Sequence, residues 1–260
     1  MLILINNISV SFQSKKSKFI ALNNFNLEIE KNEFVSLVGH SGCGKTTLLN
    51  LIAGFLKPTS GTIQFEGKDI LCPASDRVVV FQEDAVFPWL TVKKNIAYGL
   101  DAIGVNGLER ENTVNKYLEL VGLKSFADYY PKDLSGGMKK RVDLARAYAV
   151  NPKVLLMDEP FGALDAYTRQ NMQSNLLNLW DKEKKTVVFV THDISEAIFM
   201  SDKLVLMSPS PGTVHRIFKV PFERPRNQQI KKSLEFLSLQ SEIEALFHSF
   251  EKADATIITK

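Results

Sequence analysis

The stretch that decides the fold is Phe34-Val35-Ser36-Leu37-Val38-Gly39-His40-Ser41-Gly42-Cys43-Gly44-Lys45-Thr46. Its first five residues are apolar apart from Ser36, which is typical of a short strand buried on both faces of a sheet. Residues 39–46 then match the pattern G-x-x-x-x-G-K-[ST], and residues 45–52 have helical spacing. A strand, a glycine-rich loop and a helix in this order predict a phosphate-binding loop.

The chemistry of this loop follows from its residue types. Glycines let the backbone wrap tightly and direct its N–H groups at phosphate oxygens, and the helix that follows adds its positive dipole end. Lys45 is expected to reach the β- and γ-phosphates, and the Thr46 hydroxyl to bind Mg²⁺. The predicted nucleotide-binding residues here are Gly39, His40, Ser41, Gly42, Cys43, Gly44, Lys45, Thr46 and Thr47. For Cys43, a small residue that fits the loop is favoured over a reactive thiol.

Outward from this loop, further short apolar runs are followed in several cases by helical patterns. This alternation predicts an α/β fold with a mainly parallel sheet. The runs are Val78–Phe81, Val154–Met157, Val187–Val190 and Leu204–Met207. Three early segments alternate more strongly between apolar and polar residues and predict an antiparallel β patch near the N-terminus: Leu2–Val10, Phe25–Ile29 and Thr62–Glu66.

The middle and the end of the chain differ from this alternating pattern. Residues 88–150 have mainly helical spacing and predict a helical subdomain inserted between strands. After Pro225, apolar residues form an amphipathic stripe that predicts a helical extension over 226–260, following a main domain over 1–225. Packing of this stripe on its own domain is favoured over a partner-binding helix.

Two adjacent acids, Asp158 and Glu159, end the apolar run Val154–Met157. A carboxylate at the tip of a buried strand beside a phosphate loop can hold Mg²⁺, which is the role predicted for Asp158. Glu159 is the candidate for orienting or deprotonating the attacking water. The alternative, a solvated turn, is less favoured beside so complete a phosphate loop.

The sequence Leu134-Ser135-Gly136-Gly137 narrows the class of nucleotide-binding protein. It resembles the signature of ATP-binding cassette (ABC) proteins, and it would stand at the N-terminus of a helix as a second anion cradle. The resemblance implies a P-loop NTPase fold that hydrolyses ATP with Mg²⁺. It also implies that Ser135, Gly136 and Gly137 act on ATP held by the other subunit of a head-to-tail homodimer.

Other family elements occur in the expected order. Gln82 resembles the glutamine that contacts Mg²⁺ or water and senses the γ-phosphate, and Asp165 resembles the D-loop residue that bridges the two sites of the dimer. His192 resembles the switch histidine that contacts the γ-phosphate. Phe12 is the candidate for stacking on adenine, Phe19 is its competitor, and a core role for either is equally favoured.

Two positions near these motifs need separate interpretation. Met138 stands where the family usually has glutamine after the signature, and it lacks the hydrogen-bonding groups of an amide. Because Ser135 and both glycines remain, we expect an active site with altered coupling at most. Asp193, three residues before Glu196, is expected to cap the helix that follows His192.

Composition limits the cellular setting. The chain has 260 residues, a net charge of +3 spread along its length and two well-separated cysteines, which fits a reducing cytoplasm and gives no reason to propose nucleic acid as a partner. No stretch approaches the roughly 20 apolar residues that span a bilayer, and the N-terminus does not resemble a signal peptide. Any membrane role would therefore act through a partner.

Within the family, residues 81–100, 158–169 and 191–200 look like the ATPase subunits of importers for nitrate, sulfonates and taurine. This resemblance implies two transmembrane permease subunits, a solute-binding protein, and a peripheral location at the cytoplasmic face of the inner (plasma) membrane. Val86–Leu90 is either core or a permease-docking surface. The alternative function is a soluble ABC ATPase of DNA repair or translation, which would more often carry two cassettes or a coiled-coil insertion.

Overall fold

The computed structural model describes residues 1–13, 18–82 and 85–258, and the chain divides into two compact units. The first unit comprises Met1–Pro73 and Thr186–Lys260, and the second comprises Ala74–Lys185. The helical range predicted from the sequence, 88–150, lies within the second unit. Residues 226–260 lie in the first unit, together with the phosphate-loop segment.

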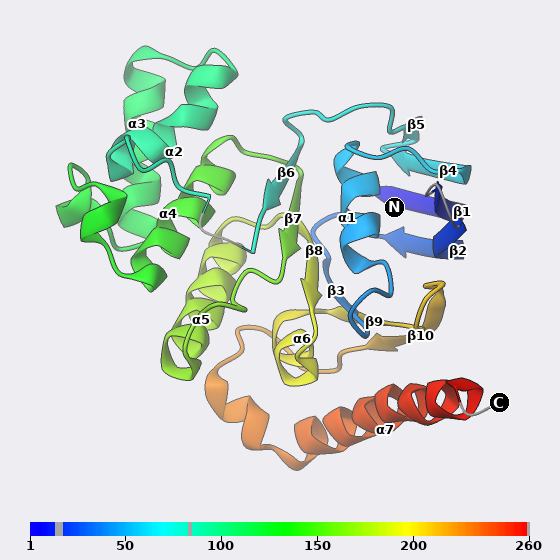
Figure 1. Ribbon diagram of the computed structural model, residues 1–260. Helices are drawn as coiled ribbons and strands as arrows, with labels where there is room; N and C mark the ends of the chain where they lie inside the picture. Colours follow the sequence, from blue (N-terminus) through cyan, green and yellow to red (C-terminus); the bar gives the residue numbers. More distant parts are fainter. Residues whose placement is uncertain (14–17, 83–84, 259–260) are drawn as a thin grey trace. The chain divides into compact units, whose positions relative to one another are not determined.

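The first unit begins with an antiparallel sheet of strand order β2-β1-β4-β5 (Figure 1). Ile3 of β1 pairs with Ile29 of β2 on one side and with Phe65 of β4 on the other, and all three side chains are buried. This sheet is the antiparallel patch expected from the alternating segments. Its strands are β1 (Ile3–Gln13), β2 (Lys18–Ile29), β4 (Ser60–Phe65) and β5 (Lys68–Asp69).

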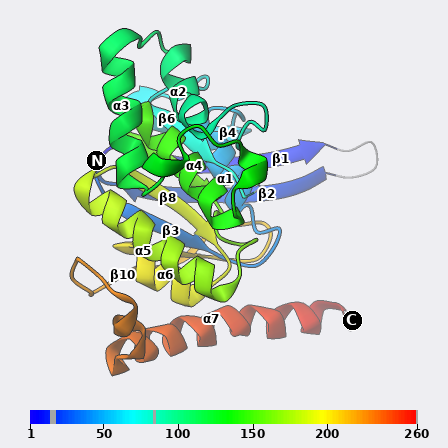
Figure 2. The ribbon, with the colours of Figure 1, turned by 90° about the vertical axis from the view of Figure 1, so that its left-hand side faces the viewer.

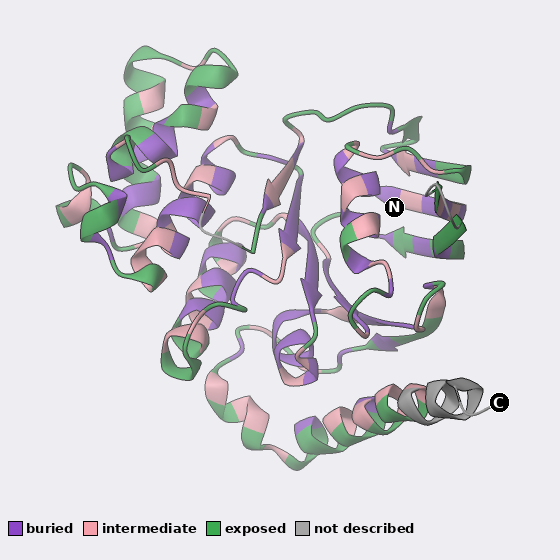
Figure 3. Cartoon of the chain, in the orientation of Figure 1, coloured by how far each residue is buried: buried purple, intermediate pink, exposed green. Residues whose placement is uncertain are grey.

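Parallel strands form the second layer of the first unit. β3 (Phe34–Val38) pairs in parallel with β8 (Thr186–Thr191) on one side and with β9 (Lys203–Met207) on the other, and β10 (Val214–Lys219) adds an antiparallel edge to β9. Every residue of β3 and β8 is buried, which explains their unbroken apolar sequences (Figure 3). Helices α1 (Lys45–Ala53) and α6 (Ile194–Met200) directly follow the phosphate loop and β8.

The C-terminal segment packs on the first unit. It consists of the 3₁₀ helix η3 (Gln228–Lys232) and the long helix α7 (Leu234–Ile258), which runs alongside α6 in both views (Figures 1 and 2). Phe236 and Ile243 of α7 are fully buried, and the Phe236 ring stacks on Phe222 with 5.6 Å between centroids. The tail therefore packs on its own unit through Phe236 and Ile243, as the favoured interpretation expects, whereas Leu234 and Leu237 of the predicted stripe are 82% and 46% exposed.

The second unit holds the parallel pair β6 (Arg77–Val80) and β7 (Val154–Asp158) and most of the helices. Its helical elements are α2 (Val92–Ala102), α3 (Gly107–Leu120), η1 (Lys124–Phe126), η2 (Pro131–Asp133), α4 (Gly136–Ala149) and α5 (Ala166–Lys182). Helix α2 packs against α3 and α4. Over residues 1–13, 18–82 and 85–258, no helix combines the length and the apolar character needed to cross a membrane.

The buried amide of Asn95 fixes the segment that precedes α2. Its Oδ1 accepts a hydrogen bond from the Phe87 N–H at 2.7 Å, and its Nδ2 donates to the carbonyls of Phe87 and Leu90 at 3.1 and 2.9 Å. Because Asn95 is fully buried, these bonds also satisfy an amide that would otherwise be costly to desolvate. The aromatic residues beside Asn95 are thus held in one position rather than on a loose loop.

Candidate active site

The phosphate loop, residues 39–46, joins β3 to α1 in the first unit. Gly42 and Gly44 have φ values of 80° and 96°, in the left-handed region that favours glycine. At Gly44, an added Cβ would also lie 2.6 Å from the Leu22 side chain and 2.9 Å from the Ala21 carbonyl oxygen. Gly44 is the N-cap of α1 and makes no side-chain cap, so the first N–H groups of that helix face the loop without competition from a side chain.

Lys45 closes this loop on itself. Its ammonium donates hydrogen bonds to the carbonyls of Gly39 at 2.6 Å and His40 at 3.0 Å, and the side chain is only 7% exposed. Thr46, the next residue, is exposed in the first turn of α1. The Lys45 ammonium is thus turned into the loop and the Thr46 side chain is open to solvent, and their contacts with phosphate and Mg²⁺ stay predictions.

Cys43 fills the interior of the loop. Its sulfur would lie 2.5 Å from a Cβ added at Gly39, and its carbonyl oxygen would lie 2.0 Å from a Cβ added at Gly212. Burial raises the pKa of the Cys43 thiol, and the nearby Lys45 ammonium opposes this only in part. These observations favour a small packing residue over a reactive thiol.

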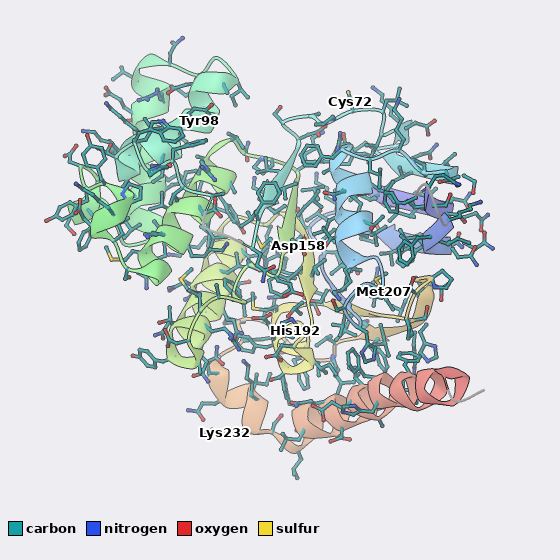
Figure 4. All side chains as sticks on the ribbon, in the orientation of Figure 1. Cys72, Tyr98, Asp158, His192, Met207 and Lys232 are labelled. Atoms are coloured by element: carbon teal, nitrogen blue, oxygen red, sulfur yellow. The ribbon has the colours of Figure 1, made fainter. Side chains whose placement is uncertain are left out.

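His192 follows β8 in the same unit and is exposed (Figure 4). The neighbouring Asp193 accepts a hydrogen bond from the Glu196 N–H at 2.9 Å and caps α6, as its spacing predicted. The Asp193 N–H in turn donates to the Thr191 hydroxyl at 3.1 Å. These two bonds fix the backbone on either side of His192, so its imidazole projects from a well-defined turn.

Phe12 and Phe19 face each other across β1 and β2 and are 43% and 50% exposed. This exposure excludes the core role that was one alternative for each residue. Both rings are therefore open to stacking, and Phe19 remains a competitor of Phe12. An aromatic contact with adenine is compatible with this arrangement.

The carboxylates lie in the second unit, at the end of β7 (Figure 4). Asp158 is the last residue of the strand, and Glu159 follows it with a φ of 42°, in the left-handed region that is uncommon for residues other than glycine. A Cβ added at Gly162 would lie 3.2 Å from Gln82 Nε2 and 3.7 Å from Glu159 Oε2. Gln82 and Glu159 therefore both lie beside Gly162, where a Cβ would crowd the Gln82 amide and make ordinary contact with the Glu159 carboxylate.

The signature residues stand at the N-terminus of α4, in the second unit. Ser135 is the N-cap, and its hydroxyl accepts a hydrogen bond from the Met138 N–H at 3.3 Å. Since Met138 contributes its backbone to this cap, the missing amide side chain leaves the cap intact. A Cβ added at Gly137 would lie 2.9 Å from Thr168 Cγ2 of α5.

Asp165 caps α5 in a similar way. Its carboxylate accepts a hydrogen bond from the Thr168 N–H at 3.0 Å, and hydrogen bonding by the Thr168 side chain and then by this N–H lowers the pKa of the carboxyl group. Thr168 thus touches both the cap at Asp165 and the glycine at position 137. The D-loop and the signature are consequently neighbours within the second unit.

Comparison with known proteins assigns the family. The model of the family described as ABC transporter matches residues 22–162, more than half of the chain. The nitrate import ATP-binding protein NrtD of Synechocystis is 42% identical over 260 residues, covering 98% of both chains. The chain belongs to the ABC transporter ATPase family.

Other relatives of this ABC ATPase agree with that assignment. An uncharacterised ABC transporter ATP-binding protein of Methanocaldococcus jannaschii is 46% identical over 92% of this chain and 88% of the relative. The bicarbonate transport ATP-binding protein CmpC of Synechocystis is also 46% identical, over 94% of this chain but 37% of its own length.

Solved structures confirm the fold and bear on the activity. A dimeric ATP-binding cassette in a post-hydrolysis state bound to ADP and phosphate has a TM-score of 0.73 and 32% identity, covering 85% of this chain and all of that chain. CbiO1 of Clostridium perfringens, with a TM-score of 0.77 and 23% identity over 96% and 98% of the two chains, supports the fold alone. This ABC ATPase hydrolyses ATP with Mg²⁺ as cofactor.

Two features of this ABC ATPase were missed by reasoning from the sequence. One is the set of linked charges on α4 formed by Lys140, Asp143 and Arg146. Their spacing of three residues was a signal in the sequence that could have indicated it. The other is the contact between His40 of the phosphate loop and Phe247 of α7. These residues are 207 positions apart, so no local sequence pattern indicates the contact.

Proposed function

We propose that this ABC ATPase powers an importer for a small polar solute such as nitrate, a sulfonate or taurine. The support is twofold. The chain covers 98% of a nitrate import ATPase, and its second unit has an apolar groove beside Gln82. The groove is the observation that carries the proposal, because it offers a binding surface for a membrane-embedded partner.

The groove has a volume of about 420 Å³ and is lined mostly by apolar side chains. Tyr98 on α2 is 50% exposed, and its ring lies 4.4 Å from that of Phe87, which in turn lies 5.5 Å from Trp89 (Figure 4). Trp89 itself is 70% exposed. Apolar and aromatic surface of this kind is typical of protein–protein hot spots, so the segment 86–90 is better suited to docking a permease helix than to a core.

The proposed catalytic roles follow from residue chemistry. Asp158, the Thr46 hydroxyl and the Gln82 amide oxygen are hard oxygen donors of the kind that Mg²⁺ prefers, and they would hold an ion that would neutralise charge on the β- and γ-phosphates. Lys45 and His192 stabilise the charge that develops on the γ-phosphate. Glu159 orients or deprotonates the attacking water.

The active form is proposed to be a head-to-tail homodimer. Ser135, Gly136 and Gly137 begin α4 with N–H groups that suit an anion, and they would act on the ATP held by the partner's phosphate loop. Asp165 would bridge the two sites. A dimeric ATP-binding cassette structure bound to ADP and phosphate supports the dimer.

The complete assembly is proposed to include two permease subunits and a solute-binding protein, with the ATPase peripheral at the cytoplasmic face of the inner membrane. The soluble alternative in DNA repair or translation has less support, because relatives at 42% and 46% identity are a nitrate import and a bicarbonate transport ATP-binding protein.

Affinity purification from the native cell tests the proposal. A tagged copy is recovered from membranes in mild detergent, and co-purifying proteins are identified and quantified by mass spectrometry. We expect a multi-span membrane protein in stoichiometric amount. A soluble partner or nucleic acid in its place would contradict the transporter role and leave the ATPase assignment standing.

Groove variants make the test specific. Tyr98→Glu places a charge in the apolar groove and should abolish recovery of the membrane protein. Leu108→Glu is the matched control, because Leu108 is 77% exposed on α3 and does not line the groove. Equal recovery with both variants would show that this groove does not bind the permease.

A further inference from the structure

Helix α4 carries three charged residues at intervals of three: Lys140, Asp143 and Arg146. This spacing places them along one side of the helix. The Asp143 carboxylate lies 2.6 Å from Arg146 Nη2 and 3.6 Å from Lys140 Nζ, so it links the two cations. The side chains of Lys140 and Asp143 are only 2% and 3% exposed.

The two cations hold the backbone around Gln82. Lys140 Nζ donates a hydrogen bond of 2.6 Å to the carbonyl of Phe81 and lies 3.4 Å from the carbonyl of Gln82. Arg146 Nη1 donates a bond of 2.7 Å to the carbonyl of Ala85. The backbone is thus tied to α4 both at Gln82 and three residues later.

Burial makes these bonds consequential. A desolvated ammonium is unfavourable unless it is paired and hydrogen-bonded, and a bond from a charged donor is stronger than one between neutral groups. Lys140 is satisfied in part by carbonyls of the very segment that carries the γ-phosphate sensor. Displacing that segment would therefore weaken the partners of a buried charge.

The same helix lines the groove and binds the backbone of the segment that carries Gln82. The Arg146 guanidinium lies 5.0 Å from the centroid of the Phe87 ring, and Asp143 and Arg146 both line the groove. At the other end, Gln82 Nε2 and Glu159 Oε2 both lie near Gly162, at 3.2 and 3.7 Å from a Cβ added there. Contacts within the second unit thus link the groove wall to the Gln82 segment, and the Gln82 side chain lies beside the same glycine as Glu159.

We infer that Lys140 is a positioning residue for ATP hydrolysis, acting through the backbone of Gln82, and that Asp143 and Arg146 connect it to the docking groove. The inference rests on the proposed roles of Gln82 and of the groove. It does not depend on which solute is transported. Charged residues of the signature helix would then set the geometry of the γ-phosphate sensor.

A double-variant cycle on the purified full-length protein tests this inference. Lys140→Met removes the donor, and we expect kcat for ATP to fall by about tenfold, with KM and ATP affinity changed by less than about twofold. In a Gln82→Ala background the same Lys140→Met change should lower kcat little further, because the effects of two residues that act through one step are not additive. Multiplicative losses would overturn the inference and show a merely structural role.

Further variants complete the test. Lys140→Arg keeps the charge and the donors and should recover most of kcat, whereas Lys139→Met on the same helix should leave it unchanged. Without nucleotide, hydrogen exchange of amides in residues 79–82 should accelerate in Lys140→Met and remain normal in Lys139→Met. Unchanged exchange would contradict the holding role of Lys140. Wild-type kcat in Gln82→Ala alone would instead overturn the proposed role of Gln82, and this inference with it.

Discussion

The imidazole of His40 stacks on the ring of Phe247, with centroids 3.9 Å apart and an angle of 27° between the planes. A hydrogen bond of 3.2 Å also joins His40 Nε2 to the Phe247 carbonyl oxygen. One residue belongs to the phosphate loop and the other to α7, so the C-terminal helix contacts the nucleotide-binding loop directly. The tail is therefore part of the environment of the active site in the first unit.

Removal of this stack should lower stability. Phe247→Ala deletes the ring but keeps the backbone carbonyl that bonds His40. A double-mutant cycle with His40→Ala therefore measures the contact between the two rings alone. We expect a coupling of about 0.5–1.5 kcal/mol in the free energy of unfolding, measured by urea denaturation without nucleotide. Leu237→Ala, at a half-exposed position on α7, should be additive with His40→Ala. Additivity of Phe247→Ala as well would show that the stack contributes nothing.

Glu159→Gln should separate binding from hydrolysis. The amide keeps the shape of the side chain but cannot accept a proton from water, so we expect kcat to fall by about 10²–10⁴-fold while ATP affinity is retained. Size-exclusion chromatography with MgATP should then show a dimer that persists. Glu28→Gln on the exposed part of β2 is the matched control. Full turnover in the Glu159 variant would remove this residue from its proposed role.

The two cysteines should differ sharply in alkylation by N-ethylmaleimide. Cys72 is exposed, whereas Cys43 is buried and burial raises the pKa of its thiol, so reactive thiolate is scarce there at neutral pH. Mass spectrometry of the folded protein should show one label, on Cys72, and two labels after unfolding. As the pH rises, labelling of Cys43 should begin at a higher pH than that of an ordinary thiol. Rapid labelling of folded Cys72→Ser at neutral pH would contradict this expectation.

Two glycines of the phosphate loop provide a matched pair for stability. Both have positive φ, but nothing lies within 4 Å of a Cβ added at Gly42, whereas one added at Gly44 meets Leu22 and Ala21. Gly42→Ala should cost about 1–2 kcal/mol from backbone strain alone. Gly44→Ala should cost more, because Leu22 must also move. Equal losses in urea denaturation would show that this close packing is not limiting.

Short buried strands were the most predictable part of the fold. β3 was predicted with its observed bounds, and β7, β8 and β9 differ by one residue at one or both ends, because strands covered on both faces have unbroken apolar sequences. β10 was not predicted. Its residues Val214–Lys219 are mostly exposed or half-exposed, so burial leaves little pattern in the sequence.

The candidate site was predictable where chemistry is encoded in contiguous residues. The loop around Lys45, the acids after β7 and the cap at Asp193 all follow from local spacing. Contacts between distant residues left no such signal. Lys140 bonds to backbone carbonyls 58 and 59 positions away, and because every residue type has the same carbonyl, nothing in the sequence marks these acceptors. The roles of all the predicted site residues, Lys45, Asp158, Glu159 and His192 as well as Gln82, Ser135 and Asp165, stay predictions, since they depend on a bound nucleotide and, for the signature and Asp165, on a second subunit.

The hydrogen bonds that the Lys45 ammonium makes within its own loop bear on how nucleotide binds and leaves. Its bonds to the Gly39 and His40 carbonyls hold the loop together through groups of the loop itself. If Lys45 reaches the phosphates as proposed, ATP binding would exchange these carbonyls for phosphate oxygens, and product release would restore them. Nucleotide affinity would then be the difference between two states in which the ammonium is hydrogen-bonded, which would favour rapid release over tight retention.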